Sequence, residues 1–177
     1  HATGHRIVVQ SYTVSGFNGG GAPMSTAAKA SELRANRLNL FDAADGYGAF
    51  NGDVVVTMDA SLGGFNALDS WRNNISGAGK LTKKGSGTLA LGGSNSYAGG
   101  TQLAEGTLQA DAAAAFGKGN VYVGGGTLVC NAPSAVTMAG AYTQLAGTTL
   151  QLNLGAGGAG SLSVAGVAAL DGTLRLS

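Results

Sequence analysis

The sequence predicts an all-β fold, a β-solenoid in which short strands stack in successive coils, here called rungs. Five times a glycine is followed by one or two threonines and then by alternating apolar residues. These glycines are Gly87, Gly106, Gly126, Gly147 and Gly172, so the steps between them are 19, 20, 21 and 25 residues, as in repeat architectures. A unit this short has no room for a helix and cannot bury its own apolar face. Successive units must therefore stack and share one core.

Composition agrees with one ordered, elongated domain carrying a short appendage. The chain has 177 residues, of which 11% are charged and 32 are glycine, and this suits tightly stacked rungs. A net charge of +1 gives no electrostatic footprint for nucleic acid or an anionic membrane surface. No apolar run is long enough for a transmembrane helix. We therefore expect no nucleic-acid partner and no transmembrane helix.

Residues 1–50 are predicted to form an N-terminal segment that differs from the repeats. The stretch His1–Pro23 is rich in glycine and irregular, apart from a short apolar run at Ile7–Val9. Between Met24 and Asp45 apolar residues recur at spacings of three and four, which predicts a short N-terminal helix. This helix either caps the first rung or ends an upstream globular domain. The sequence leaves both roles open.

Residues 51–177 are predicted to form the solenoid itself. The first candidate strands are 54–59 and 71–75, and beyond them turn residues follow at regular intervals. The further expected strands are 80–82, 88–91, 101–103, 107–110, 121–123, 127–130, 142–145, 149–154, 161–164 and 173–176. Alternating residues of a strand point to one face, so Leu89, Leu108 and Leu128 should lie above one another, about 4.8 Å apart. Glycine before each Thr-Leu pair fits a corner, where positive φ is needed.

The two ends of the chain also carry expectations. The chain begins at His1 with neither methionine nor a signal peptide, so it is interpreted as a processed or excised fragment. The last expected strand, 173–176, has no cap after it and would leave backbone groups unpaired. Either the natural chain continues there or another molecule pairs with that strand.

No catalytic residue is predicted in this chain. Its two histidines, His1 and His5, have no acid or base placed beside them. The signatures of serine hydrolases are absent, and the serines fall mostly at turns. Cys130 is the sole cysteine, which excludes an internal disulfide and a cysteine-based zinc site, and predicts a small core residue.

No cofactor-binding or metal-ligating residue is predicted either. The segment Gly77–Lys80 resembles a phosphate loop but lacks its upstream glycine and the hydroxyl residue after lysine, so a glycine turn is the better interpretation. Asp42, Asp45 and Asp53 fit no calcium-loop spacing and are assigned to a helix end and a turn.

Two groups of side chains could instead contact a ligand at the surface. The basic group Lys80, Lys83 and Lys84 is predicted to be a solvated turn rather than a phosphate or glycan contact. The aromatic residues Trp71, Tyr97, Tyr122 and Tyr142 lie about one rung apart and could form a glycan platform, although a place in the core is favoured.

The stretch Trp71–Thr101 carries a recognisable motif, Trp-Arg-Asn-Asn-Ile-Ser-Gly-Ala-Gly-Lys-Leu-Thr-Lys-Lys-Gly-Ser-Gly-Thr-Leu-Ala-Leu followed by Gly-Gly-Ser-Asn-Ser-Tyr-Ala-Gly-Gly-Thr. It resembles the autotransporter-associated β-strand repeat of secreted passenger domains, and looser copies extend it over somewhat more than half of the chain. The resemblance implies a right-handed parallel β-helix that is secreted from, or displayed at the surface of, a Gram-negative bacterium. It also implies an outer-membrane β-barrel downstream in the same precursor.

The preceding stretch, Arg37–Phe50, resembles the junction at which autotransporters with a PAP2-type acid-phosphatase domain pass into their β-helix. Subtilisin-like autotransporters have a similar junction, to which the likeness is smaller. The resemblance implies an upstream catalytic domain. The histidine contexts of such a phosphatase do not occur in these 177 residues.

Three hypotheses of function follow. The chain is a structural passenger segment, a stalk or spacer for export and display. Alternatively it is the C-terminal part of a secreted hydrolase, acid-phosphatase-like rather than subtilisin-like, or it is a self-assembling or glycan-binding surface module. Its expected partners are an upstream catalytic or adhesive domain and the downstream barrel, and end-to-end self-association is left open.

Overall fold

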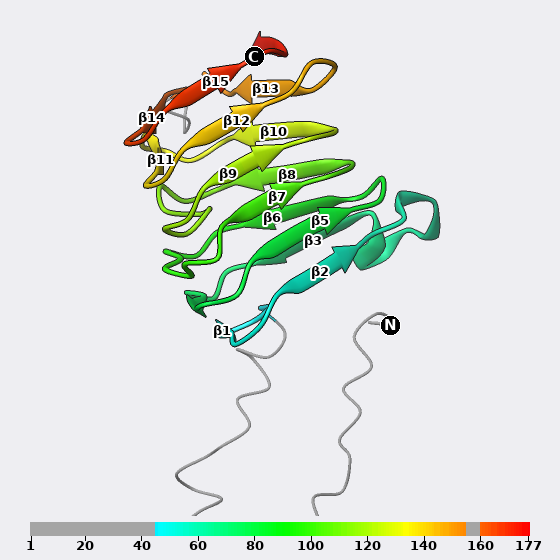
Figure 1. The fold of residues 1–177 in the computed structure, drawn as a ribbon. Coiled ribbons are helices and arrows are strands. Elements are labelled where there is room, and N and C mark those ends of the chain that lie inside the picture. Colours follow the sequence, from blue (N-terminus) through cyan, green and yellow to red (C-terminus); the bar gives the residue numbers. More distant parts are fainter. Residues whose placement is uncertain (1–44, 155–159) are drawn as a thin grey trace, which may run out of the picture. The chain divides into compact units, whose positions relative to one another are not determined.

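The computed structural model describes residues 45–154 and 160–177, and these confirm the predicted β-solenoid (Figure 1). Its strands are β1 (Ala49–Phe50), β2 (Val54–Thr57), β3 (Leu68–Trp71), β4 (Ser76–Gly77), β5 (Leu81–Lys84), β6 (Thr88–Leu91), β7 (Thr101–Leu103), β8 (Thr107–Ala110), β9 (Val121–Val123), β10 (Thr127–Cys130), β11 (Val136–Met138), β12 (Tyr142–Gln144), β13 (Thr149–Leu152), β14 (Leu162–Val164), β15 (Ala168–Leu170) and β16 (Thr173–Leu176). Two short 3₁₀ turns, η1 (Ala60–Leu62) and η2 (Gly64–Asn66), lie between β2 and β3. The predicted N-terminal helix falls almost wholly outside the described residues, and the division into 1–50 and 51–177 stays a prediction.

Strand pairing is parallel throughout the described residues, and each strand pairs with its counterpart one rung away. Two six-stranded sheets form the long sides, one in the order β2, β5, β7, β9, β12, β15 and the other in the order β3, β6, β8, β10, β13, β16. The third side is less regular and contains the short pairs β1–β4 and β11–β14. Figure 1 shows the rungs stacked along one direction, from β2 to β15.

The leucine ladder predicted from the repeat is confirmed. The second residues of β6, β8, β10, β13 and β16 are in register from one rung to the next and form the column Leu89, Leu108, Leu128, Leu150 and Leu174. A second inward column contains Leu91, Ala110, Cys130, Leu152 and Leu176. Alternation along these strands places both columns on the same face, the interior. Each fully buried leucine of these columns, such as Leu108, contributes about 1.5–3 kcal/mol.

The facing sheet and the third side complete the core. Leu81, Leu103 and Val123 lie inward on the facing sheet, and Ile75 and Phe116 fill the third side. The strand expected at 71–75 was wrong, because the chain pairs with β6 over Leu68–Trp71 and then turns away to the third side. The short strands β11 and β15 were not predicted from the sequence.

Glycine is needed where the corners of successive rungs stack. Gly106 and Gly126 have φ of 72° and 80°, a conformation that disfavours any residue with a Cβ. A Cβ would also lie 2.2 Å from the Gly85 carbonyl oxygen at Gly106, and 2.1 Å from the Gly106 carbonyl oxygen at Gly126. The corners are therefore closely packed backbone, which explains the glycine before Thr-Leu in these repeats.

Candidate functional sites of the solenoid

Lys83 lies inside the solenoid, so the prediction of a solvated turn is wrong for this residue. Its β5 position is in register with Val56 on one side and Leu103 on the other, and none of its surface is exposed. Its Nζ donates to the carbonyl oxygens of Lys84 at 2.9 Å, Gly85 at 2.8 Å and Glu105 at 3.3 Å. An ammonium group has three donors, so these carbonyls satisfy it.

The Lys83 side chain therefore links the backbone of two successive rungs at a corner, from inside the solenoid. The Glu105 side chain, one rung further on, also stabilises this corner, because its carboxylate accepts a hydrogen bond from the Gly85 backbone N–H at 2.8 Å. Burial lowers the pKa of Lys83, and the charge of Glu105 opposes this to a smaller extent. The alternation of Leu81 with Lys83 was the sequence signal for this inward position, because the same alternation places Leu81 in the core.

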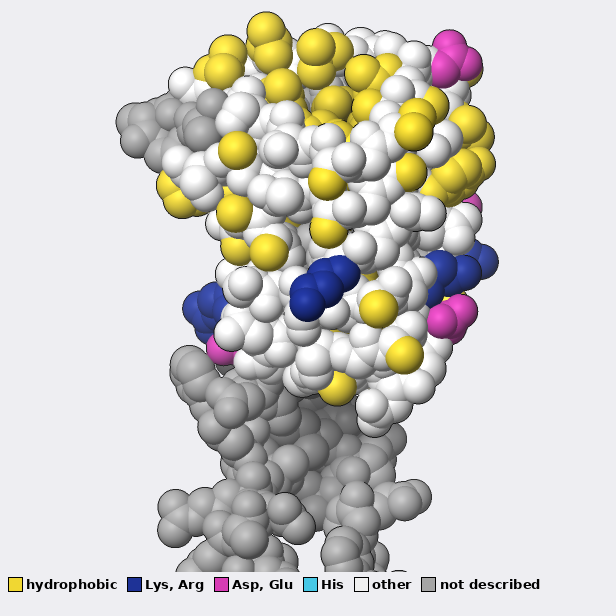
Figure 2. Space-filling model, turned by 60° about the vertical axis from the view of Figure 1, so that its left-hand side comes forward, with side chains coloured by type: hydrophobic (Ala, Val, Ile, Leu, Met, Phe, Trp, Pro, Cys, Tyr) yellow, Lys and Arg dark blue, Asp and Glu magenta, His cyan; other side chains and the backbone are white. Residues whose placement is uncertain are grey.

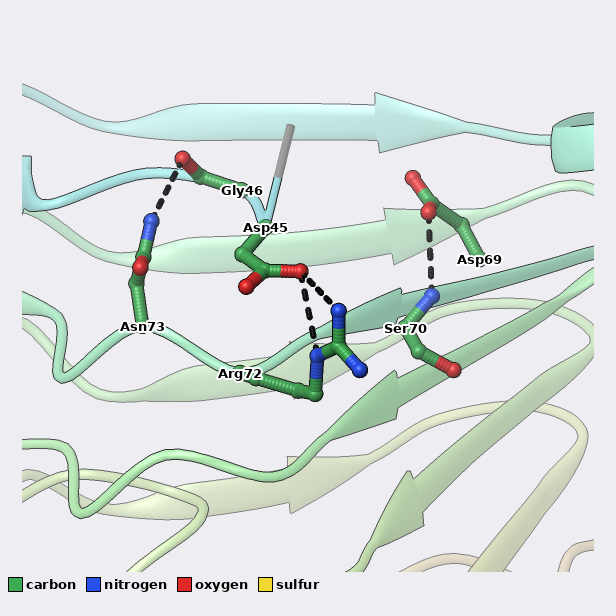
Figure 3. A network of polar contacts seen from close by, with 6 residues as sticks. All are labelled: Asp45, Gly46, Asp69, Ser70, Arg72 and Asn73. Atoms are coloured by element: carbon green, nitrogen blue, oxygen red, sulfur yellow. Dashed lines mark hydrogen bonds and ion pairs between the residues drawn. The ribbon is translucent and has the colours of Figure 1, made fainter. Parts of the chain in front are cut away.

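Asp45 and Asp53, weighed as calcium ligands, instead hold neighbouring rungs together by separate ion pairs. The Asp45 Oδ1 atom accepts hydrogen bonds from Arg72 Nε at 3.0 Å and Nη2 at 2.5 Å (Figure 3). Asp53 pairs with Lys80, whose backbone N–H donates to Asp53 Oδ1 at 3.0 Å. Asp42 lies outside the described residues. Within 45–154 and 160–177 no group of three acidic, histidine or cysteine side chains could hold a metal ion.

In the first rung the two inward columns end at a hydrogen-bonded pair, Asp69 and Trp71. Asp69 and Trp71 on β3 are in register with Leu89 and Leu91, and both side chains are buried. Trp71 Nε1 donates to Asp69 Oδ2 at 2.9 Å. The Ser70 backbone N–H donates to Asp69 Oδ1 at the same distance (Figure 3). A carboxylate thus stands where each later rung, from β6 on, has a leucine.

Most of the aromatic residues belong to the core, as favoured from the sequence. Trp71, Tyr97 and Tyr142 are at most 5% exposed, whereas Tyr122 on β9 is 39% exposed. The hydroxyl of Tyr97 is 2.6 Å from Thr101 Oγ1, so its polar tip is satisfied within the core. With three rings facing inward, a glycan platform of these four aromatic residues does not form.

Cys130 is a core residue, as predicted. Its side chain occupies the inward column between Ala110 and Leu152 and is 2% exposed. Burial raises the pKa of the thiol to about 12. Because the thiolate is the nucleophilic form, the Cys130 thiol is unreactive in the folded protein.

A ladder of polar side chains follows the strands β8, β10, β13 and β16 at their C-terminal ends. Asn131 Nδ2 donates to Asp111 Oδ1 at 2.7 Å, Asn153 Nδ2 donates to Asn131 Oδ1 at 2.8 Å, and Ser177 Oγ donates to Asn153 Oδ1 at 2.7 Å. Each bond joins one rung to the next. The ladder therefore links four consecutive rungs by side chains as well as by backbone.

The last rung presents the interior columns to solvent. Leu174 and Leu176 on β16 are 60% and 59% exposed, and Leu170 on β15 is 64% exposed. Figure 2 shows apolar side chains gathered at this end of the molecule. In the rung below, Leu150 of the same column is 4% exposed. The difference arises because no further rung lies on β15 and β16 in this structure.

Comparison with known proteins identifies the repeat. The family Passenger-associated-transport-repeat matches residues 81–110, which run from β5 to β8. The chain is 36% identical over 129 residues to the Adhesin BmaC autotransporter of Brucella suis biovar 1 (strain 1330), a match covering 68% of this chain and 4% of the adhesin. It is 51% identical over 57 residues to an Extracellular serine protease of Serratia marcescens, covering 32% of this chain and 5% of the protease.

These matches cover the chain far better than they cover the relatives, of which the chain spans a small part. No solved structure gives a significant match. Among the residues that the structure describes, no helix is long and apolar enough to cross a membrane.

Proposed function

We propose that this chain serves as a stalk or spacer that holds another domain away from the cell. The chain is a β-helical repeat segment of an autotransporter passenger, secreted from or displayed on a Gram-negative bacterium. The observation that carries this proposal is the pair of inward columns that run through successive rungs. The six strands of each long sheet are separated by five steps of about 4.8 Å, roughly 24 Å of reach. We assign this role to residues 51–177.

The same architecture supports a contribution to export by stepwise folding. Each rung pairs with the rungs directly beside it, at a sequence separation of about one repeat. A rung that emerges from an export pore can therefore stack on the preceding edge without waiting for distant parts of the chain. The residues that carry this role are the stacked leucines and the corner glycines, and no catalytic side chain is needed for it.

Deletion of one whole rung tests the spacer role. Removing residues 107–126 joins Gly106 directly to Thr127, which is in register with Thr107, so the columns stay continuous. In a precursor that carries its cargo domain, we expect cargo display and activity to persist after this deletion. The matched control removes 107–116, about half a rung, which breaks the register and should abolish display. Equal loss of cargo function in both deletions would contradict a spacer role.

We propose further that the precursor places a catalytic or adhesive domain upstream of this segment and an outer-membrane β-barrel downstream. Similarity to an autotransporter adhesin and to an extracellular serine protease supports such an arrangement. Among hydrolases, the match to a protease supports a protease parent over the phosphatase parent suggested by the junction at Arg37–Phe50. Peptidase and phosphatase assays of the 177-residue chain should both be negative, and activity in either would overturn the assignment of catalysis to another domain.

A further inference from the structure

We propose that the corner between β2 and β3 is a cleavage site for an endopeptidase that prefers a large apolar residue before the scissile bond, and that the two pieces of the chain stay together after the cut. Hydrolysis consumes one water molecule, breaks one backbone C–N bond and leaves a new carboxylate and a new amino group. The proposal goes beyond the role as a spacer and does not depend on it.

This corner is the enlarged one among the described corners that join the two long sheets (Figure 1). It spans residues 58–67, whereas the corresponding corners after β5, β7, β9, β12 and β15 have two to four residues. Its tip carries Leu62, which is 70% exposed, and Phe65, which is 43% exposed. Exposed loop tips are preferred sites of proteolytic cleavage. The peptide bonds after these two apolar residues therefore lie where a peptidase can reach them.

The tip of this corner is held mainly by hydrogen bonds within itself. The turns η1 and η2 are closed by local bonds, such as that from the Leu62 N–H to the Asp59 carbonyl oxygen at 3.0 Å, and neither turn contains a buried residue. A bond to the next rung, from the Ala60 N–H to Ser86 Oγ at 3.0 Å, anchors the start of the tip. The tip can therefore open into the extended form that a peptidase binds without exposing the core.

Other exposed leucines lie where the backbone is held more firmly. Leu68 is 56% exposed, but it belongs to β3, which pairs with β6. Leu145 is 39% exposed and lies in the short corner after β12. Its N–H donates to the Val123 carbonyl oxygen at 3.0 Å, and its own carbonyl oxygen accepts from Thr148 Oγ1 at 2.7 Å. Exposure of the side chain is thus comparable at these leucines, and the hold on the backbone differs.

The piece that ends after β2 stays paired with the remainder of the chain after the cut. Strand β1 pairs with β4 and β2 pairs with β5, and both partners lie beyond the cut. Phe50 and Met58 of the first piece are at most 3% exposed and belong to the hydrophobic core. The ion pair of Asp45 with Arg72 also joins the two pieces. Pairing of a separate strand with a sheet edge, with pockets for its side chains, is a common mode of binding, so a cut at this corner does not by itself release the preceding piece.

Limited proteolysis of the 177-residue chain with chymotrypsin tests the site. We expect the first cut within residues 45–154 to give a fragment that begins at Gly63 or Asn66, identified by N-terminal sequencing. The double variant Leu62→Ser, Phe65→Ser should slow this cut at least tenfold and retain the native circular dichroism, because both side chains lie at the surface. The matched control is Leu68→Ser, which makes the same kind of change at an exposed strand position and should leave the rate of the cut unchanged.

Size-exclusion chromatography of the cut protein tests whether the two pieces stay together. In native buffer we expect them to elute as one species, and in concentrated urea as two. Phe50→Ala removes a buried ring from the first piece and should weaken its retention in the cut protein at least tenfold. The matched control is Val55→Ala, because Val55 is an exposed residue of β2 and should leave retention unchanged.

Three results would overturn the proposal. A native chain that chymotrypsin leaves intact at residues 58–67 has no cleavage site there. A first cut after Leu68 or Leu145 would show that exposure of a leucine, rather than the enlarged corner, decides where the chain is cut. Wild-type pieces that elute separately in native buffer would show that the first piece is released. None of these results bears on display by an intact spacer, which the deletion of one rung tests separately.

Discussion

Replacing Leu108 by alanine should destabilise the solenoid strongly, because its side chain lies inside an inward column with a leucine on the rung at either side. Leu108 is wholly buried between Leu89 and Leu128. Loss of a buried leucine side chain, with the cavity it leaves, costs about 2–5 kcal/mol. A domain of this size has a total stability of about 5–15 kcal/mol. The substitution should therefore remove a large fraction of the free energy of unfolding.

Two matched variants serve as controls for Leu108→Ala. Gln109→Ala changes the next residue of β8, which points outward and donates from Nε2 to Asp111 Oδ1 at 2.8 Å, so its cost should be about 1 kcal/mol or less. Leu174→Ala makes the same chemical change as Leu108→Ala at a position that is 60% exposed. With about two-fifths of the burial remaining, its cost should be roughly 1–2 kcal/mol.

The assay is equilibrium urea unfolding followed by circular dichroism. The order of cost should be Leu108→Ala, then Leu174→Ala, then Gln109→Ala. Equal costs at Leu108 and Leu174 would refute the inference that stacking between rungs, rather than the local strand, stabilises the fold. So would a cost at Leu108 no larger than that at Gln109.

Three further predictions concern a corner, a buried charge and a thiol. Gly106→Ala should lower the free energy of unfolding by about 1–3 kcal/mol, because φ at Gly106 is positive and the new Cβ would meet the Gly85 carbonyl oxygen. Gly48 has open space around it, so Gly48→Ala should be nearly neutral in the same unfolding assay. Burial lowers the folded-state pKa of Lys83 below its ordinary value of 10.5. Between the folded and the unfolded pKa the unfolded chain binds more protons, so the free energy of unfolding should rise with pH towards 10.5. Lys83→Met should abolish that rise, and a pH profile unchanged by the substitution would contradict the prediction. Cys130, buried and with its pKa raised to about 12, should resist a thiol reagent at pH 8 in native protein and react at once in urea; rapid native labelling would show that the rung opens.

The repeat made the stack predictable, because one pattern of residues recurs with one physical cause. Every Thr-Leu pair that follows a corner glycine had to lie in register with the next, since a shift of one residue would turn the leucines outward. Leu89, Leu108 and Leu128 could thus be placed from spacing alone. The strand at β3 was misplaced because Leu68 is exposed and Asp69 occupies an inward position, so the local alternation is reversed in polarity.

The buried polar residues could not be placed in the same way. Lys83 shares the inward alternation of Leu81 on β5, but its charge suggests a surface position, and one of the carbonyls that accept from its Nζ belongs to Glu105, 22 residues further along the chain. The polarity of Asp69 likewise suggests a surface position, but Trp71 supplies a hydrogen bond that compensates its burial. Such partners come from the fold, and sequence periodicity carries no information about them.

Contacts confined to adjoining rungs have a mechanical consequence. Tension applied across the stack meets an edge rung first, and the polar ladder breaks one bond at a time, from Ser177–Asn153 to Asn153–Asn131 and then Asn131–Asp111. Each rung that peels away frees about 20 residues, or roughly 70 Å of extended chain. A segment of this kind therefore lengthens under load in small successive steps, one rung at a time, instead of unfolding all at once.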